Sequence, residues 1–256
     1  MTTVMITGAS SGLGASLAKQ FAARGVHLLL VARREVLLAA LQAELLAAGA
    51  SSVEFRVVDL ADEKQVQLLA HDLPKLGVDV LINNAGLGHW DLSWNTTPEM
   101  MRTMIAVNMS AVAVLSLAFS QIRYEQPARL MNVASGAGYA LFENSIPYSA
   151  SKFFVTALTE GIALELSNQK LAMRAQLLAP GPIATEFMMN AMQGSKIDMT
   201  NVHGMDKIKF HTPEQVAELA MQLYDSDAVV GAVQADMSFV LSGGLHTVGQ
   251  LVEGDW

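Results

Sequence analysis

Tyr148 and Lys152 are the two side chains of this sequence whose types and spacing best fit proton transfer. They are four residues apart at the start of a predicted helix over 148–169, so they share one face of it. A free tyrosine has a pKa of about 10, too high to give up and regain a proton near neutral pH. A lysine cation close by favours tyrosinate and lowers that pKa. This spacing alone is weak evidence for a proton-transfer pair, because tyrosine and lysine often lie four residues apart on a solvated helix face.

A second pattern is a glycine-rich turn, Thr7-Gly8-Ala9-Ser10-Ser11-Gly12-Leu13-Gly14, between a predicted strand and a predicted helix. Glycines let such a turn approach a pyrophosphate, and the helix N-terminus supplies free N–H groups and a positive dipole end. The pattern favours a dinucleotide site, with an ordinary strand–helix turn as the alternative.

The end of the second predicted strand indicates which dinucleotide the site would bind. Sites for NAD place an acidic residue there to bind the ribose 2′-hydroxyl, whereas this chain has Ala32 followed by Arg33 and Arg34. Arginine pairs well with a 2′-phosphate, so the sequence favours NADP(H), with NAD(H) left open. The alternative is two solvated arginines at a strand end.

These patterns belong to an alternation of strands and helices. Such alternation predicts an α/β fold, a doubly wound parallel sheet with helices on both faces, in a single domain over residues 1–256. One stretch, 186–211, lacks clear periodicity, and we expect a substrate loop or lid there. The predicted strands are 3–7, 27–32, 53–58, 78–83, 130–134, 172–178 and 238–242, and the predicted helices are 14–24, 35–48, 63–73, 98–124, 148–169 and 212–224.

Composition excludes several classes of protein. The net charge of −8 argues against nucleic-acid binding, which needs clustered lysine and arginine. The absence of cysteine excludes disulfides, thiolate metal sites and a cysteine nucleophile, and it fits an intracellular protein. We expect no membrane span, no signal peptide and no metal site, and therefore a cytoplasmic location.

Several motifs together resemble those of the short-chain dehydrogenases/reductases, over 7–244. The glycine spacing is TGxxxGxG rather than GxGxxG, Asn83-Asn84-Ala85-Gly86 matches the NNAG motif, and Pro180-Gly181-Pro182-Ile183-Ala184-Thr185 resembles the PGxxxT turn. Asn132-Val133-Ala134-Ser135 and Tyr148-Ser149-Ala150-Ser151-Lys152 also look like family motifs. The chain departs at Ser242, where many relatives have aspartate, which leaves C-terminal subunit packing in doubt.

The resemblance implies a Rossmann-like fold and a catalytic set of Asn108, Ser135, Tyr148 and Lys152. Ser135 would hold the substrate oxygen against Tyr148, Lys152 would also bind the nicotinamide ribose, and Asn108 would position a water. Tyr139 also lies near Ser135 in sequence, but it has Glu143 rather than a cation four residues on. The expected cofactor contacts are Thr7, Gly8, Ser10, Ser11, Gly12, Leu13, Gly14, Arg33, Arg34, Asp59, Leu60, Asn84, Ala85, Gly86, Tyr148, Lys152, Pro180, Gly181, Ile183 and Thr185.

The implied activity is an NADP(H)-dependent interconversion of a carbonyl and a secondary alcohol by hydride transfer. A non-catalytic dinucleotide-binding sensor on the same fold is the main alternative, and an acidic structural protein would leave the glycine loop unexplained.

Apolar residues indicate both the kind of substrate and whether the chain assembles with copies of itself. Methionines after Thr185 and two tryptophans suggest a lid over a pocket for a bulky apolar substrate, although the methionines could equally fill a core or an interface. Helical stretches 100–119 and 153–166 are apolar on more than one side, which predicts a homodimer or homotetramer unless loops cover them. The lid residues are Met188, Met189, Met192, Met199, Met205, Trp90 and Trp94, and His89, His203 and His211 are expected at the polar surface.

Overall fold

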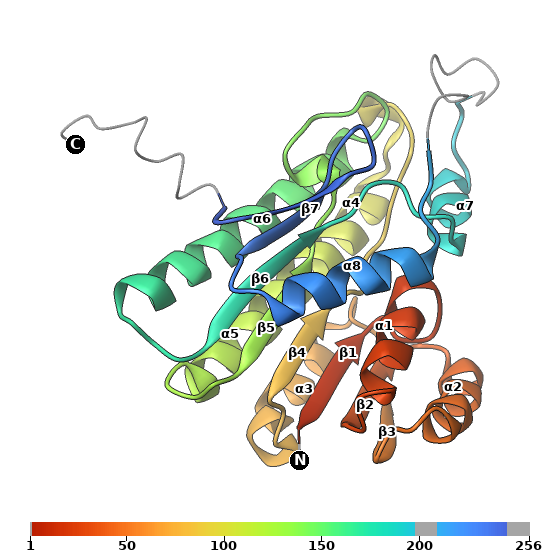
Figure 1. Cartoon of the computed structure of the whole chain (residues 1–256). Coiled ribbons are helices and arrows are strands. Elements are labelled where there is room, and N and C mark those ends of the chain that lie inside the picture. Colours follow the sequence, from red (N-terminus) through yellow and green to blue (C-terminus); the bar gives the residue numbers. More distant parts are fainter. Residues whose placement is uncertain (1, 198–208, 245–256) are drawn as a thin grey trace.

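The computed structural model describes residues 2–197 and 209–244, which form one α/β domain around an eight-stranded sheet (Figure 1). The spatial order is β3-β2-β1-β4-β5-β6-β7-β8; the first seven of these strands run parallel, and β8 runs antiparallel to β7. This confirms the predicted fold class. The strands are β1 Thr3–Thr7, β2 His27–Ala32, β3 Ser52–Val57, β4 Val80–Asn83, β5 Arg129–Val133, β6 Arg174–Ala179, β7 Val230–Val233 and β8 Phe239–Ser242.

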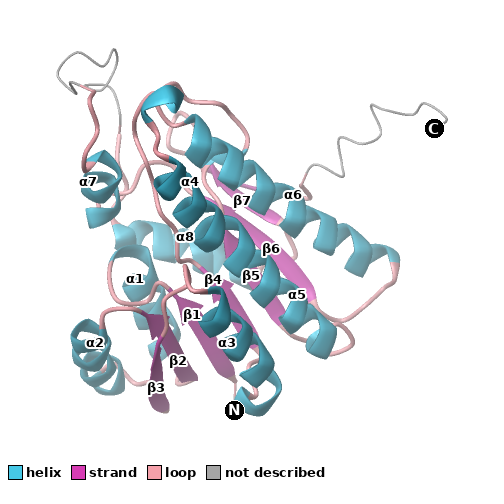
Figure 2. Cartoon of the chain, turned by 180° about the vertical axis from the view of Figure 1, so that it is seen from behind, coloured by secondary structure: helices cyan, strands magenta, loops and turns pink. Residues whose placement is uncertain are grey.

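Helices cover both faces of the sheet, as the views from the front and from behind show (Figures 1 and 2). Helices α1, α2 and α8 contribute to the core on one face, and α3, α5 and α6 contribute to the core on the other. The helices are α1 Gly12–Ala22, α2 Glu35–Ala47, α3 Glu63–Leu76, α4 Pro98–Met104, α5 Val112–Arg123, α6 Ile146–Asn168, α7 Glu186–Met192 and α8 Pro213–Asp225.

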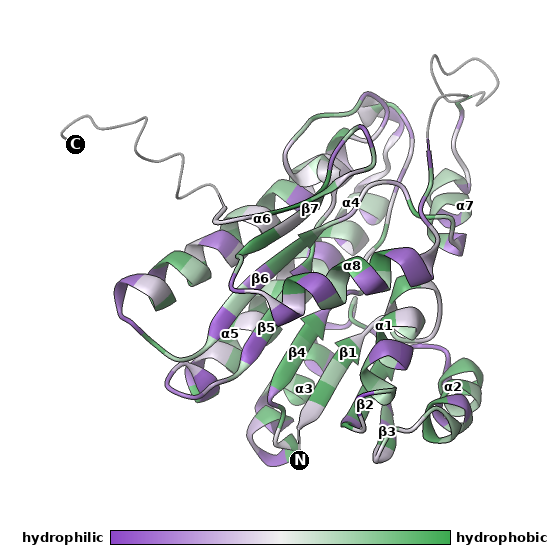
Figure 3. Ribbon diagram, in the orientation of Figure 1, coloured by the Kyte–Doolittle hydropathy of each residue, from purple (hydrophilic) through white to green (hydrophobic). Residues whose placement is uncertain are grey.

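Alternating side chains along the central strands build the two cores. In β1, Val4 and Ile6 belong to the core beneath α1, whereas Met5 between them belongs to the core beneath α3 and α5. The two-residue period of a strand requires this division. The central strands β1 and β4 are therefore largely apolar, while the helices carry polar residues among their apolar ones (Figure 3).

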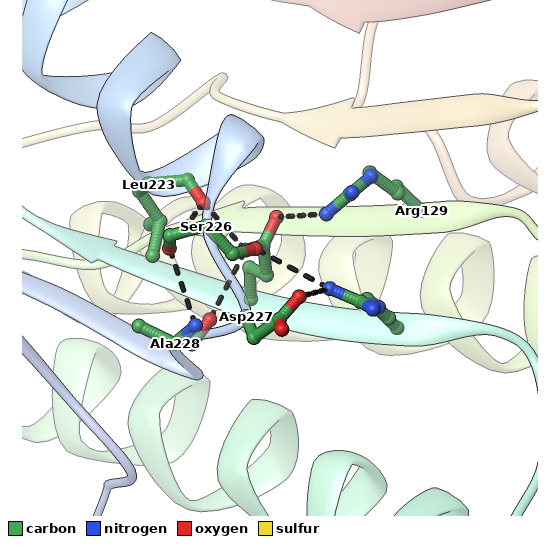
Figure 4. Close-up of polar contacts among 7 residues, drawn as sticks. Arg129, Leu223, Ser226, Asp227 and Ala228 are labelled. Atoms are coloured by element: carbon green, nitrogen blue, oxygen red, sulfur yellow. Dashed lines mark hydrogen bonds and ion pairs between the residues drawn. The ribbon is translucent and has the colours of Figure 1, made fainter.

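Strand β7 was not predicted, because its position depends on a tertiary contact rather than on a sequence pattern. The buried side chain of Gln176 in β6 donates hydrogen bonds to the carbonyls of Leu223 at 2.7 Å and Ala228 at 3.0 Å. The Ser226 hydroxyl donates to the Leu223 carbonyl at 2.8 Å and accepts from the Ala228 N–H at 3.2 Å (Figure 4). These bonds fix the turn that delivers the chain from α8 into β7.

Two further predictions differ from the structure. The expected long helix over 98–124 is divided, because a π-helical segment at Ile105–Ala111 separates α4 from α5. The expected loop over 186–211 begins instead with α7, and residues 198–208 of that stretch lie outside the described residues.

The helical run Pro98–Arg123 is the one candidate membrane span among the described residues. It has the length and apolar composition to cross a membrane, contrary to the expectation from sequence, and 44% of its most apolar window is buried. Val107, Ala111, Leu115 and Phe119 of this run pack into the core beneath the sheet. A core helix passes the same test of length and composition, so the feature is weak evidence for a membrane span.

Candidate active site

A cleft of about 1230 Å³ opens at the carboxyl ends of the parallel strands. From β1 the chain builds β2 and β3 on one side and then crosses to β4 on the other, so β1 and β4 flank the point where the strand order reverses. Ligands of open α/β sheets bind in the crevice at such a point. The loops after β1, β4, β5 and β6 all contribute residues to the cleft wall.

The glycine loop after β1 has the backbone conformation that its glycines were expected to allow. Gly8 and Gly12 have φ angles of 66° and 54°, in the left-handed region that glycine tolerates best. A Cβ atom at Gly14 would lie 2.3 Å from the Gly8 carbonyl oxygen, so only glycine fits there. Helix α1 begins at Gly12, and its N-cap residue Ser11 makes no side-chain capping bond. The first N–H groups of α1 therefore keep their ability to bind an anion.

Thr7 and Asn84 hold this loop against the loop after β4. The Thr7 hydroxyl accepts hydrogen bonds from the N–H groups of Asn84 at 3.0 Å and Ala85 at 3.1 Å. The Asn84 amide donates to the carbonyls of Thr7 at 3.0 Å and Gly8 at 3.3 Å. Thr7 and Gly14 do not line the cleft themselves, and both support the loop that does.

The two arginines after β2 both line the cleft but have different surroundings. The Arg34 guanidinium donates to the hydroxyls of Ser10 and Ser11, and it forms a 3.0 Å ion pair with Glu186 at the start of α7. Arg33 is exposed and makes no hydrogen bond or ion pair with any residue that the structure describes. Arg34 thus joins the glycine loop to α7, whereas the charge of Arg33 is available to a ligand.

The other residues predicted to contact the cofactor also lie in the cleft wall. After β3 these are Asp59 and Leu60, and after β4 they are Asn84, Ala85 and Gly86. Thr185 is the N-cap of α7, and its methyl carbon would lie 3.1 Å from a Cβ atom at Gly12. The turn after β6 therefore packs directly on the glycine loop, and it contributes Pro180, Gly181, Ile183 and Thr185 to the wall.

Tyr148, Ser135 and Lys152 meet in the same cleft. Ser135 lies close enough to the Tyr148 hydroxyl to work against the rise in its pKa, and the Lys152 ammonium lies 5.6 Å from the centre of the Tyr148 ring. The ammonium donates to the Val133 carbonyl at 2.9 Å. Strand β5 ends just before Ser135 and α6 begins just before Tyr148, so rigid elements position all three groups.

Burial controls the ionisation of Tyr148 and Lys152. It raises the pKa of Tyr148 to about 12, although the hydrogen bond from Ser135 works in the opposite direction. Burial also lowers the pKa of Lys152 to about 8, because the charged form loses its hydration. The sequence led us to expect a lowered tyrosine pKa. That expectation counted an oxidised nicotinamide as well as Lys152, and in the chain alone burial is the largest effect on the Tyr148 pKa and raises it.

Asn108 lies behind the cleft rather than in its wall. Its fully buried amide accepts from the Leu87 N–H at 2.7 Å and donates to the Leu87 carbonyl at 2.8 Å and the Ser151 hydroxyl at 3.0 Å. The π-helical segment that carries Asn108 is a feature often found at functional sites. A Cβ atom built on Gly86 would lie 3.5 Å from Asn108 Oδ1 and 3.6 Å from Lys152 Nζ, so both polar groups border the Gly86 backbone.

Tyr139 also lines the cleft, but its hydroxyl has a different partner. It donates to the buried Glu160 carboxylate at 2.6 Å, and burial together with this bond raises its pKa far above the ordinary range. A tyrosine held by a carboxylate cannot readily become tyrosinate. Tyr139 is therefore much the poorer proton carrier, although the sequence did not reveal Glu160 as its partner.

The other end of the cleft is formed by apolar side chains. The Phe187 ring packs against the Tyr148 ring with centroids 5.7 Å apart, and Trp90 and Met188 lie in the same wall. Trp94 and Met189 are 80% and 68% exposed, and neither lines the cleft, which contradicts their predicted place in a lid over the pocket. Met192 is half-buried outside the wall, and Met199 and Met205 lie outside the described residues.

His89 is the residue of this region that the sequence analysis misjudged most. We expected polar surface, but His89 is 8% exposed and lines the cleft. Its position three residues after the NNAG motif was the feature of the sequence that could have indicated a place in the cleft. His211 is half-buried and joins the turn after β6 through backbone hydrogen bonds with Pro182 and Ala184, and His203 lies outside the described residues.

Comparisons with known proteins agree with this geometry. The family model for short chain dehydrogenases matches residues 2–196. A dehydrogenase/reductase of the SDR family, member 11, from Gallus gallus is 34% identical over 192 residues, which cover 72% of this chain and 75% of that protein.

Solved structures extend the likeness over most of the chain. A short-chain dehydrogenase from Sphingobium yanoikuyae in complex with NADPH has a TM-score of 0.80 at 29% identity, covering 98% of this chain and 91% of that one. A Burkholderia phymatum relative in complex with NAD has a TM-score of 0.77 at 25% identity, with coverages of 98% and 91%. A bulky-bulky ketone specific alcohol dehydrogenase from Comamonas testosteroni has a TM-score of 0.76 at 25% identity, with coverages of 90% and 85%. The chain therefore belongs to the short-chain dehydrogenase/reductase family and is an oxidoreductase acting on CH–OH or carbonyl groups.

Proposed function

We propose that this protein is an NADP(H)-dependent enzyme that interconverts a carbonyl and a secondary alcohol, with Tyr148 as the general acid and base. The observation that carries the proposal is the meeting of the Tyr148 and Ser135 hydroxyls with the Lys152 ammonium in the cleft that the glycine loop also lines. A dinucleotide-binding protein without catalysis would have no need of this arrangement.

The cleft fits a nicotinamide dinucleotide along its length. At Gly8 a Cβ atom would lie 2.8 Å from the Ala85 Cα atom, so glycine lets the loops after β1 and β4 pack closely at the floor of the cleft. The uncapped start of α1 would bind the pyrophosphate, and Arg33 would bind a 2′-phosphate. When bound, the nicotinamide dinucleotide would supply the hydride that adds to the substrate carbonyl carbon. Lys152 would hydrogen-bond its ribose from the opposite end of the cleft.

The residues of the chain supply the proton. During reduction, Ser135 would hold the substrate oxygen by a hydrogen bond, and Tyr148 would give its proton to that oxygen. A pKa of about 12 keeps Tyr148 protonated at neutral pH, which is the state that reduction needs. The positive charge of Lys152 would stabilise the tyrosinate that remains. Asn108, beside Gly86 and Lys152, would position a water through which the proton is restored. Alcohol oxidation uses the same groups in reverse.

The preference for NADP(H) rests on Arg33. Its guanidinium lies in the cleft wall with no partner among the described residues, and no acidic residue ends β2 to bind a ribose hydroxyl. The NADPH of the Sphingobium yanoikuyae relative supports this preference, while the NAD of the Burkholderia phymatum relative shows that the fold accepts both.

The apolar end of the cleft favours a bulky substrate. Phe187 packs against Tyr148, and Met188, Trp90 and Phe142 line the same cleft. The bulky-ketone specificity of the Comamonas testosteroni relative is consistent with such a pocket. A cytoplasmic location and assembly as a homodimer or homotetramer also belong to this proposal.

A direct test follows absorbance of the reduced nicotinamide while a panel of ketones and aldehydes is offered with NADPH and with NADH. We expect turnover of at least one bulky ketone and a higher kcat/KM with NADPH. Tight binding of NADPH without turnover of any carbonyl compound, or of any secondary alcohol with NADP⁺, would instead identify a sensor.

A further inference from the structure

Helix α7 forms part of the cleft wall but has little of its own to hold it in place. It is seven residues long, too short to be stable by helix propensity alone, and Ala191 is its single buried residue. Its Phe187 nevertheless packs against the Tyr148 ring, with centroids 5.7 Å apart. Contacts outside the helix must therefore fix its position.

Each end of α7 is tied to a different loop. At its start, Glu186 forms a 3.0 Å ion pair with Arg34, but both side chains are about half exposed, and exposed ion pairs contribute little. Beyond its end, the Lys196 N–H donates to Asp91 Oδ2 at 3.0 Å. Asp91 is only 2% exposed, so water does not compete for this bond. The buried contact is the stronger of the two anchors.

The Asp91 carboxylate joins two segments that are 105 residues apart in the sequence. Its Oδ1 atom accepts from the Leu92 N–H at 2.7 Å and the Asn95 amide at 2.8 Å within one loop, and its Oδ2 atom reaches across to Lys196. Burial raises the pKa of Asp91, but these hydrogen bonds and a smaller effect of His89 outweigh it and leave the pKa below its usual value. The carboxylate is therefore charged at neutral pH, which strengthens each bond that it accepts.

The loop that carries this carboxylate also packs on α7 beside the reacting groups. The Trp90 N–H donates to the Ala191 carbonyl at 2.8 Å. A Cβ atom at Gly88 would lie 2.8 Å from both Ala191 Cβ and Phe187 Cε1, so the two segments are in close contact. Phe187 thus contacts this loop as well as the Tyr148 ring. A displacement of α7 would change the cleft wall next to the hydroxyl that is proposed to carry the proton.

We propose that Asp91 is a positioning residue, which holds α7 by the Lys196 N–H and so keeps Phe187 and the substrate wall in place beside Tyr148. Neither Asp91 nor Lys196 lines the cleft, so both act through α7. The inference rests on the proposed carbonyl reduction and adds to it a residue that determines how well a bulky substrate binds. The groups that would bind the cofactor and move the proton are left unchanged.

Asp91→Asn tests the contact selectively. The Oδ1 atom of the amide can still accept from Leu92 and Asn95, whereas the NH₂ group that replaces Oδ2 cannot accept from the Lys196 N–H. Lys196→Pro removes the same bond from the other side, because proline has no N–H. Lys196→Ala is the matched control, since it changes the side chain and keeps the N–H.

The measured quantities are KM and kcat for the bulky ketone that the wild type reduces best with NADPH, and the Kd of NADPH. We expect KM to rise about tenfold in Asp91→Asn and in Lys196→Pro, the effect of losing a hydrogen bond to a charged group, with little change in kcat or in the Kd of NADPH. The double variant should be no worse than either single variant, because all three lack one and the same bond. Lys196→Ala should behave as the wild type.

Hydrogen exchange gives a second readout that needs no substrate. The Lys196 amide should be protected in the wild type and in Lys196→Ala, and it should exchange faster in Asp91→Asn. Faster exchange together with an unchanged KM would overturn the inference, because Asp91 would then hold the segment without affecting the substrate wall.

An equal rise of KM in Lys196→Ala and Lys196→Pro would also overturn it, because the side chain rather than the N–H would be responsible. Melting temperatures show which variants are folded, and Lys196→Pro decides the question if Asp91→Asn does not fold. All these results leave the proposed function intact. Failure of the wild type on the entire carbonyl and alcohol panel would contradict the proposed function, and the positioning role with it.

Discussion

At the scale of single residues, burial decides the protonation of the two groups that would move a proton. Lys152 is 4% exposed, and its pKa of about 8 leaves it mostly cationic at pH 7. Tyr148, with a pKa of about 12, remains a phenol under the same conditions. The spacing of the two residues could be predicted from sequence because a helix has a fixed period. Their pKa values could not, because they depend on how much of the surrounding protein covers them.

Tyr148→Phe removes the hydroxyl that would carry the proton and keeps the ring that packs on Phe187. We expect kcat to fall at least about 10²-fold, the lower end of what a positioned acid or base contributes, with little change in NADPH affinity. Tyr139→Phe is the comparison, and it should lose far less activity because its hydroxyl is held by Glu160. Retention of most activity in Tyr148→Phe would rule out the assigned role.

Lys152→Met should lose activity and become more stable to unfolding. The pKa of Lys152 is about 8 in the folded chain and 10.5 when free, so below pH 8 both states are charged and the folded state bears the cost of burying the cation. Removing the charge should raise the free energy of unfolding at pH 7 by about 1–3 kcal/mol while abolishing turnover. The advantage of the variant should shrink as the pH rises from 8 to 10.5, where folded wild-type lysine becomes neutral first. Denaturant unfolding at pH 7 and pH 10 measures this, and an advantage independent of pH would contradict it.

At the scale of elements, sequence patterns succeeded where one repeat dominates. Strands β1 and β2 and helices α2 and α8 were predicted to within one residue or so, because their apolar periods and bounding residues are clear. The π-helical segment was not predicted, because the apolar pattern of 98–124 continues through it unchanged; Asn108 in this segment is bonded to the backbone of Leu87, which lies outside the helical run. Strand β7 likewise depends on the distant Gln176.

The loop after β2 shows how an element divides roles between two identical side chains. From sequence, Arg33 and Arg34 were both candidates for the 2′-phosphate, and the preference for NADPH was expected to depend on Arg33. In the structure, Arg34 ties the glycine loop to α7 through Ser10, Ser11 and Glu186, whereas Arg33 has no described partner. The distinction depends on α7, an element that the sequence analysis did not predict.

Arg33→Ala should therefore lower the ratio of kcat/KM for NADPH over NADH by roughly tenfold to a hundredfold, the size of a lost charge-assisted contact. Arg34→Ala is the matched variant. It should weaken both cofactors to a similar extent, because it loosens the glycine loop without removing the free cation. Wild-type preference for NADH, or a larger change of preference in Arg34→Ala than in Arg33→Ala, would contradict this division.

At the scale of the whole molecule, the sheet order gathers the motifs into one cleft. Each motif follows a parallel strand, and the carboxyl ends of parallel strands share one edge, so the sequence was sufficient to predict that the motifs gather around one cleft. The substrate half was not predictable to the same degree. It forms where the segment after β4 packs on α7, and the burial of His89 results from that contact between segments about 100 residues apart.

The remaining prediction is that the chain assembles with copies of itself. Helices α5 and α6 pack together on one face of the sheet, and both keep apolar side chains exposed on their outer sides. These include Val114 and Leu117 of α5 and Phe153 and Leu164 of α6. Monomers rarely tolerate a contiguous patch of this kind, and an isologous contact between two copies would cover it on both.

Leu117→Glu combined with Leu164→Glu would place like charges against each other across such an interface and should convert a dimer or tetramer to a monomer. Leu68→Glu is the control, because Leu68 is also an exposed leucine but lies on α3, a different helix. Size-exclusion chromatography with light scattering at micromolar concentration measures all three proteins. We expect the wild type and Leu68→Glu at twice or four times the chain mass of 27.4 kDa, and the double variant at that mass. A wild-type protein that elutes as a single species of 27.4 kDa would be a monomer with these helix faces exposed to solvent, and it would contradict the predicted assembly.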